Sequence, residues 1–62
     1  HIADGLVYEV SKDEIQPEDY IEKEREADGE MRFRILTRRQ LPDSQLQKPN
    51  VEDGYLCVLK EI

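Results

Sequence analysis

The sequence has no tryptophan, one histidine and one cysteine among its 62 residues. With Cys57 alone, no disulfide can form within the chain, and a structural zinc site, which needs four Cys or His ligands, is nearly excluded. The chain opens with His1 and Ile2, which suggests a cut chain or an expression remnant, so we do not expect His1 to be a ligand. We therefore expect no cofactor and no metal. A lone cysteine suits a reducing compartment, which favours a cytoplasmic protein.

Several other absences argue against catalysis and membrane insertion. Gly5, Gly29 and Gly54 are isolated, so the chain has no glycine-rich loop for a phosphate. No serine or cysteine has a nearby histidine, which removes the usual base for nucleophilic catalysis. Paired carboxylates need a deep cleft for acid–base chemistry, and a domain this small rarely encloses one. No run approaches 18 apolar residues, so no segment is expected to cross a membrane. We expect a protein that is not an enzyme.

The length limits the stability that the chain can reach alone. We expect residues 1–62 to form one small domain, either by itself or as a fragment or small subunit of a larger assembly. A domain of this size buries only about 60% of the surface that its unfolded chain exposes. Without a disulfide or a metal, tight packing and burial against another chain are the remaining sources of stability. This favours a protein partner or self-association.

The charge of the chain, −6 overall, is unevenly distributed. Residues 1–30 hold eleven acids and three bases, whereas residues 31–50 hold five bases and one acid. Residues 51–62 hold three acids and one base. Such asymmetry bears on which partners approach the protein, but it does not determine the fold.

Three segments have the pattern of strands. Residues 6–10 are β-branched and aromatic after an Asp-Gly turn signal, and residues 31–37 alternate, with Met31, Phe33 and Ile35 on the side of the core. Residues 54–61 also follow an Asp-Gly pair and are apolar on both faces. A strand of this kind is expected at the centre of a sheet or at an interface.

The segment 17–27 fits two interpretations. Pro17 suits the first turn of a helix, the acids after it complement the helix dipole, and Gly29 is placed to end the helix. Alternatively, Asp28 and Gly29 form the turn of a hairpin that pairs 20–27 with 30–37. That register sets Lys23 opposite Arg34 and Arg25 opposite Arg32, and opposed like charges destabilise a sheet. We therefore favour a helix over 17–27.

Two shorter segments connect these elements. Ser11 and Glu14 match the capping-box pattern, although Pro17 limits that helix to a single turn. Residues 41–50 form a loop with two prolines, in which Asp43 is placed to cap one helical turn. We expect Leu41, Leu46 and Val51 to anchor this loop. The predicted fold is therefore α+β, with one short helix packed on a small antiparallel sheet of about three strands. If 20–27 is a strand, the alternative is an all-β small barrel or hairpin sheet.

The segment MRFRILTRR, residues 31–39, carries the strongest functional signal. It gathers four of the nine bases, and arginine is well suited to recognise carboxylates or phosphates. These arginines either pair with nearby acids of 17–27 or contact a partner. We predict a non-enzymatic protein–protein interaction module, or a small subunit of a complex, with four partner-binding residues: Arg32, Arg34, Arg38 and Arg39.

Two further functions remain open. A nucleic-acid binder could use the same arginines, but alternation points Phe33 into the core, which removes the aromatic platform that single-strand binders use. The sequence pI of about 4.6 also opposes it. The other alternative is an acidic polyanion mimic that presents Glu18 to Glu30 to a basic partner.

Overall fold

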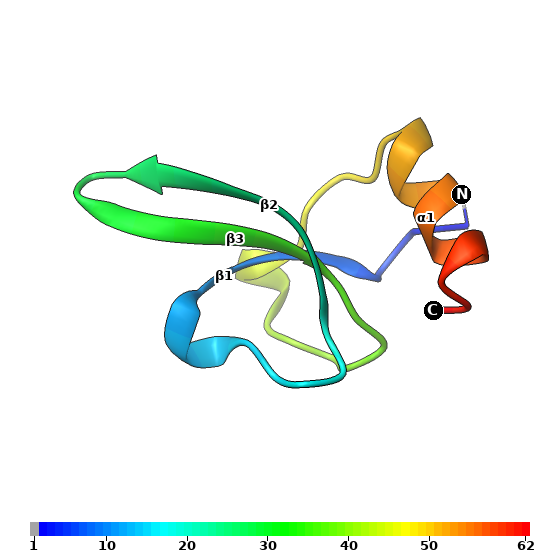
Figure 1. Ribbon diagram of the computed structural model, residues 1–62, viewed down its shortest axis with the longest axis horizontal. Coiled ribbons are helices and arrows are strands. Elements are labelled where there is room, and N and C mark those ends of the chain that lie inside the picture. Colours follow the sequence, from blue (N-terminus) through cyan, green and yellow to red (C-terminus); the bar gives the residue numbers. More distant parts are fainter. Residues whose placement is uncertain (1) are drawn as a thin grey trace.

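The computed structural model describes residues 2–62, and His1 lies outside this part. The described chain folds into an antiparallel three-stranded sheet, one α-helix and two 3-10 turns (Figure 1). The sheet has the strand order β1-β3-β2, so β3 is central. The elements are β1 (Val7–Ser11), η1 (Lys12–Glu14), β2 (Tyr20–Ala27), β3 (Glu30–Leu36), η2 (Asp43–Gln45) and α1 (Val51–Leu59). The predicted α+β class, with one helix on a small antiparallel sheet, is confirmed.

The helix predicted over 17–27 is wrong, because residues 20–27 form β2. Asp28 and Gly29 have φ angles of 52° and 79°, which fit the hairpin turn that was the less favoured interpretation of the sequence. Arg25 does lie opposite Arg32, and Lys23 lies opposite Arg34. The repulsion is offset by a group far away in the sequence: Glu9 of β1 reaches across β3 and binds Arg25 with an N–O distance of 2.9 Å.

The strand predicted over 54–61 is also wrong, because residues 51–59 form α1. The helix begins with a reciprocal cap, in which Asn50 accepts from the backbone N–H of Asp53 and Asp53 accepts from that of Asn50, both at 2.8 Å. The pair Asp53–Gly54, interpreted from the sequence as a turn, therefore lies within the first helical turn. Two donors that a helix start leaves unpaired are satisfied in this way.

The sheet has a small apolar cluster on each face, where the sequence predicted one core. On one face α1 contributes Cys57 to a cluster with Ala3, Val7 and Leu36. On the other face the buried residues are Tyr8, Val10, Phe33 and Ile35, with Ile15 and Leu41 packed against them. The prediction that Phe33 and Ile35 face the core is confirmed, whereas Met31, nearer the hairpin turn, is 42% exposed.

The loops between the elements follow the predicted local chemistry in part. Glu14 accepts from the backbone N–H of Ser11 at 2.9 Å, so the single-turn capping box is confirmed. The predicted turn near Asp43 is also present, although its N-cap is Pro42. Of the expected loop anchors, Leu41 packs against the core, while Leu46 is 40% exposed.

The helix α1 and the β2–β3 hairpin turn lie at opposite ends of the molecule (Figure 1). One side of α1 packs on the sheet, and the other side is left at the surface of this end. None of the helices within residues 2–62 is long and apolar enough to cross a membrane.

Candidate protein-binding surfaces

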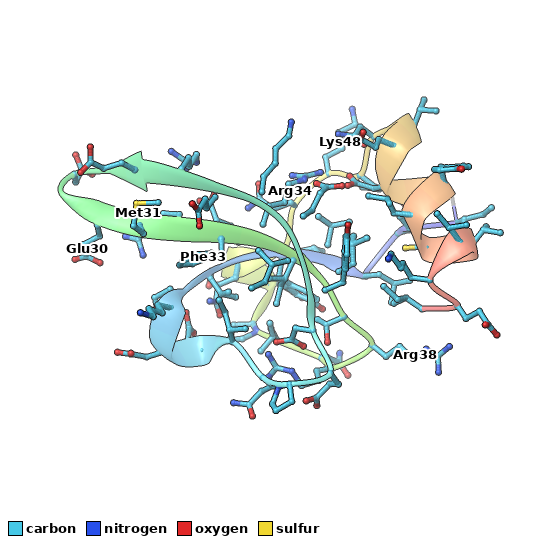
Figure 2. The ribbon with its side chains drawn as sticks, viewed as in Figure 1. Glu30, Met31, Phe33, Arg34, Arg38 and Lys48 are labelled. Atoms are coloured by element: carbon cyan, nitrogen blue, oxygen red, sulfur yellow. The ribbon has the colours of Figure 1, made fainter. Side chains whose placement is uncertain are left out.

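Arg34 points from the central strand into a group of buried carboxylates. Its Nε donates to Glu22 Oε1 at 2.8 Å, and its terminal nitrogen donates to the carboxylate of Asp53. The same nitrogen donates to the backbone carbonyl of Lys48 at 3.2 Å. The Arg34 side chain is 20% exposed, and those of Glu22 and Asp53 are 4% and 0% exposed. Figure 2 shows Arg34 between the sheet and the start of α1, so this arginine ties the helix to the sheet.

The two carboxyl groups beside Arg34 differ in their affinity for a proton. Burial raises the pKa of Glu22, its interaction with Asp53 raises it further, and Arg34 opposes this only in part. Burial would also raise the pKa of Asp53, but hydrogen bonds with Glu22, Arg34 and the N–H of Asn50 lower it overall. Glu22 Oε2 and Asp53 Oδ1 are the buried side-chain atoms of residues 2–62 without a hydrogen-bond partner. Burial and the neighbouring Asp53 therefore favour the protonated form of Glu22, whereas the groups around Asp53 favour its ionised form.

Arg39 and Arg38 also bind within the chain. Arg39 binds Asp19 through two nitrogens, at 3.0 Å and 2.7 Å, and also donates to the carbonyl of Glu14 at 3.1 Å. The Asp19 carboxylate is fully buried. Burial would raise the pKa of Asp19, but its hydrogen bonds, chiefly with Arg39, lower it. Arg38 donates to the backbone carbonyl of Glu61. It lies beside the C-terminal end of the chain and away from Arg34 (Figure 2).

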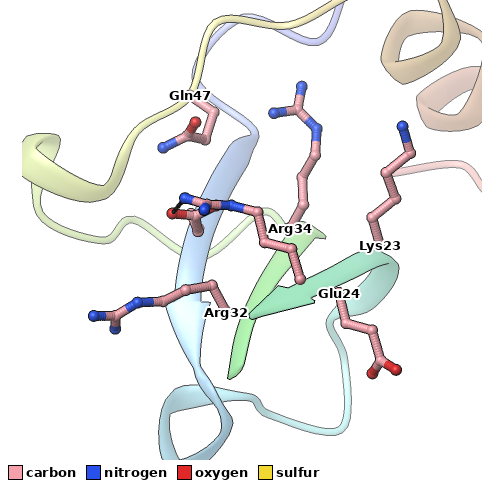
Figure 3. A pocket seen from close by; sticks show the side chains of 7 residues that line it. Lys23, Glu24, Arg32, Arg34 and Gln47 are labelled. Carbon is pink, nitrogen blue, oxygen red and sulfur yellow. Dashed lines mark hydrogen bonds and ion pairs between the residues drawn. The ribbon is translucent and has the colours of Figure 1, made fainter. Parts of the chain in front are cut away.

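Arg32 is the arginine of the predicted set with the weakest intramolecular contact, a 3.8 Å approach to exposed Glu30. It lines a groove of about 270 Å³ on the sheet face, together with Lys23, Arg25 and Arg34 among the bases. Figure 3 shows that Arg32 points away from Lys23 and Arg34, so these charges do not converge on one point. The groove therefore lacks the converging donors of a phosphate or carboxylate site.

Of the four predicted partner-binding residues, the structure brings Arg32 and Arg34 onto one sheet face and sets Arg38 and Arg39 beyond the end of β3. Arg34 and Arg39 bind buried carboxylates, as the intramolecular alternative in the sequence analysis expected. Arg32 and Arg38 retain more freedom to contact another molecule. A shared arginine patch is therefore not formed.

The outer face of α1 is a second surface, which the sequence analysis did not locate on a helix. Val51, Tyr55 and Val58 are 86%, 65% and 61% exposed, although their spacing of four and three residues places them on one face. Exposed Leu59 and Ile2 extend the patch. A shallow apolar hollow of about 530 Å³ lies over this patch, lined by Ile2, Val51, Gly54, Tyr55 and Val58. We call the exposed residues Ile2, Val51, Tyr55, Val58 and Leu59 the outer face of α1.

This exposure corrects the prediction that Val51 anchors a loop. The side of α1 that packs on the sheet carries Asp53, Gly54 and Cys57, and these leave Val51 on the opposite side. The sequence did hold a signal for the surface, because 54–61 is apolar on both faces. That signal was assigned to a buried strand, whereas here one apolar face packs on the sheet and the other meets solvent.

Comparisons of the chain with protein-family models, with curated proteins and with solved structures each found no match. Among residues 2–62, no group of three or more His, Cys, Asp or Glu side chains could hold a metal ion. The two features of the described residues that bear on function are the charged sheet face and the outer face of α1.

Proposed function

We propose that the protein is a non-enzymatic interaction module, or a small subunit of a complex, that binds a protein partner through the outer face of α1. The observation that carries this proposal is the contiguous exposure of Val51, Tyr55, Val58 and Leu59 on a capped helix. Scattered exposed apolar side chains are ordinary, but contiguous apolar patches mark interaction sites. Complete burial of an exposed valine or leucine side chain yields about 1.5–3 kcal/mol, and the isolated chain gains only a part of this at Val51, Val58 and Leu59.

The geometry supports a preformed docking surface. The reciprocal cap of Asn50 and Asp53 fixes the start of α1, and the bond between Arg34 and Asp53 fixes the helix on the sheet. A partner would therefore meet a helix that is already ordered, which reduces the entropy lost on binding. We further propose that Arg32 and Arg38 make secondary contacts with a partner, outside the outer face of α1. Arg34 and Arg39 instead stabilise the fold by binding buried carboxylates. The buried free thiol of Cys57 suits the reducing cytoplasm, where we expect the protein to work.

Site-specific photo-cross-linking tests this proposal. A photo-reactive phenylalanine analogue replaces Tyr55 on the outer face of α1, exposed Glu24 on β2, or Arg32 on the charged sheet face, in an extract of the native source. We expect cross-links to another polypeptide from position 55 and none from position 24. Cross-links from position 32 with none from position 55 would refute the helix face as the docking surface and favour the arginine cluster.

A further inference from the structure

We infer that the partner of the outer face of α1 is a second copy of the same chain, with the two α1 helices packed antiparallel about a two-fold axis. This inference rests on the proposed function and names its partner. It draws on the spacing of the apolar side chains, on the charges at the two ends of α1, and on the place of the helix at one end of the molecule.

The apolar spacing fits pairing of the helix with itself. A two-fold axis that passes between Gly54 and Tyr55 relates positions at equal distances before and after it. Val51 of one copy then meets Val58 of the second, and the two Tyr55 side chains lie next to each other. Spacings of four and three residues are those of a coiled-coil seam. The contact between the two Tyr55 side chains therefore lies in line between the two symmetric contacts of Val51 with Val58. A two-fold interface requires this self-complementarity of a single patch.

The charges at the ends of α1 favour the antiparallel arrangement. Exposed Lys48 precedes the helix and exposed Glu61 follows it, so antiparallel packing sets Lys48 of each copy near Glu61 of the other. A parallel pair would instead set Lys48 against Lys48 and align the two helix dipoles.

The expected dimer is weak. The outer face of α1 covers a helix of nine residues, so the pair buries less than the roughly 1,200 Å² of a standard interface. We expect a dissociation constant of about 0.1–1 mM for the isolated chain. Such an association responds to concentration and is strengthened when the chain is held in a larger assembly.

Sedimentation equilibrium of the purified chain tests the inference, over a range from about 20 µM to 2 mM that brackets the expected constant. We expect a reversible monomer–dimer equilibrium that Val58→Glu weakens at least about tenfold. Circular dichroism checks that this variant stays folded, as expected for a side chain that is 61% exposed. A monomer throughout this range would overturn the inference, as would association that Val58→Glu leaves unchanged.

Charge reversal tests the orientation. Lys48→Glu should weaken the dimer about two- to tenfold, and Lys48→Glu combined with Glu61→Lys should restore it. The matched control is Lys12→Glu, which makes the same charge change in η1 and should leave association unchanged. If the double variant is weaker than Lys48→Glu alone, the antiparallel two-fold arrangement is refuted. A monomeric chain that still cross-links to a different protein from position 55 would overturn this inference and leave the proposed function standing.

Discussion

At the scale of single residues, the burial of a carboxylate decides what its arginine partner does. Arg34 and Arg32 are two residues apart on one face of β3, and the sequence presents them as equivalent. They differ because Arg34 meets Glu22 and Asp53, which lie 12 and 19 residues away and are almost fully buried. Contacts of that separation depend on the fold, so no local pattern distinguishes the two arginines.

This difference predicts unequal effects on stability. Arg34→Gln should lower the free energy of unfolding by about 2–4 kcal/mol, because it leaves the ionised Asp53 buried without its cation. Arg32→Gln, the matched control on the same strand face, should change it by less than about 0.5 kcal/mol. Urea denaturation of both variants measures the two values. Equal small losses would show that the Arg34 cluster contributes nothing to the fold.

The same cluster predicts how stability depends on pH. The pKa of Glu22 is raised above its ordinary value of 4.5 in the folded state, so its contribution is complete below 4.5 and is lost as pH rises through the raised value. The pKa values of Asp53 and Asp19 are lowered, so their contributions are lost as pH falls below 3.8. Arg34, Asp53 and Cys57 interact electrostatically with Glu22.

The variant Glu22→Gln tests the loss of stability that the ionisation of Glu22 causes as the pH rises. The glutamine cannot ionise, so the variant should keep a level urea midpoint from pH 4.5 to pH 9, the ordinary pKa of the Cys57 thiol, whereas the wild type declines over this range. Both proteins should still lose stability below pH 3.8. A wild-type urea midpoint that rises above pH 4.5 would mean that ionisation of Glu22 does not destabilise the folded protein.

At the scale of elements, the sequence predicted one helix and three strands, and the structure has both numbers. The helix was predicted over 17–27 and a strand over 54–61, whereas 20–27 is a strand and 51–59 is the helix. The segment 20–27 has a weak apolar face as a helix. As a strand it tolerates Arg25 opposite Arg32, because Glu9 offsets the charge of Arg25 from outside the hairpin. The segment 51–59 contains Val, Tyr, Cys and Gly, which are all poor helix formers. Its helical state depends on the cap and on packing against β1 and β3. The single turns near 12–14 and 43–45, whose chemistry is local, were predicted.

The cap of α1 should therefore matter more than an average surface contact. Asn50→Ala removes the side chain that accepts from the N–H of Asp53 and should cost about 1 kcal/mol. The control is Asp43→Ala, which changes an exposed residue that begins η2 without acting as its cap. Helical circular dichroism and thermal melts compare the variants. An Asn50→Ala protein as stable and as helical as the control would mean that packing alone holds α1.

At the scale of the whole molecule, two thin clusters share one sheet, so each large buried side chain carries much of the stability. Phe33→Ala should remove about 3–5 kcal/mol, which is close to the total for a domain of this size. Met31→Ala, on the same face of the same strand but 42% exposed, should cost about 1 kcal/mol or less. Denaturation curves decide. A folded Phe33→Ala protein with nearly native stability would contradict the assignment of that cluster as a core.

The small size of these two clusters also explains why one apolar face of α1 stays exposed. The chain has one cysteine and no metal-binding group of side chains among the described residues, and α1 uses one of its two apolar faces to complete the cluster under it. The other face is available to a second molecule. The size and composition of the chain predicted dependence on a partner. The outer face of α1 could not be predicted, because it exists only when 51–59 is a helix.

A dilution series followed by amide NMR tests this central claim most directly. Spectra of the labelled chain are recorded from about 2 mM to 20 µM, the range that spans the dissociation constant expected for so small an interface. We predict that concentration-dependent shifts cluster at Val51–Leu59 and at Ile2, and that the β2–β3 hairpin stays unchanged. Shifts confined to the hairpin and to Arg32, with α1 unchanged, would contradict the assignment of the outer face of α1 as the docking surface.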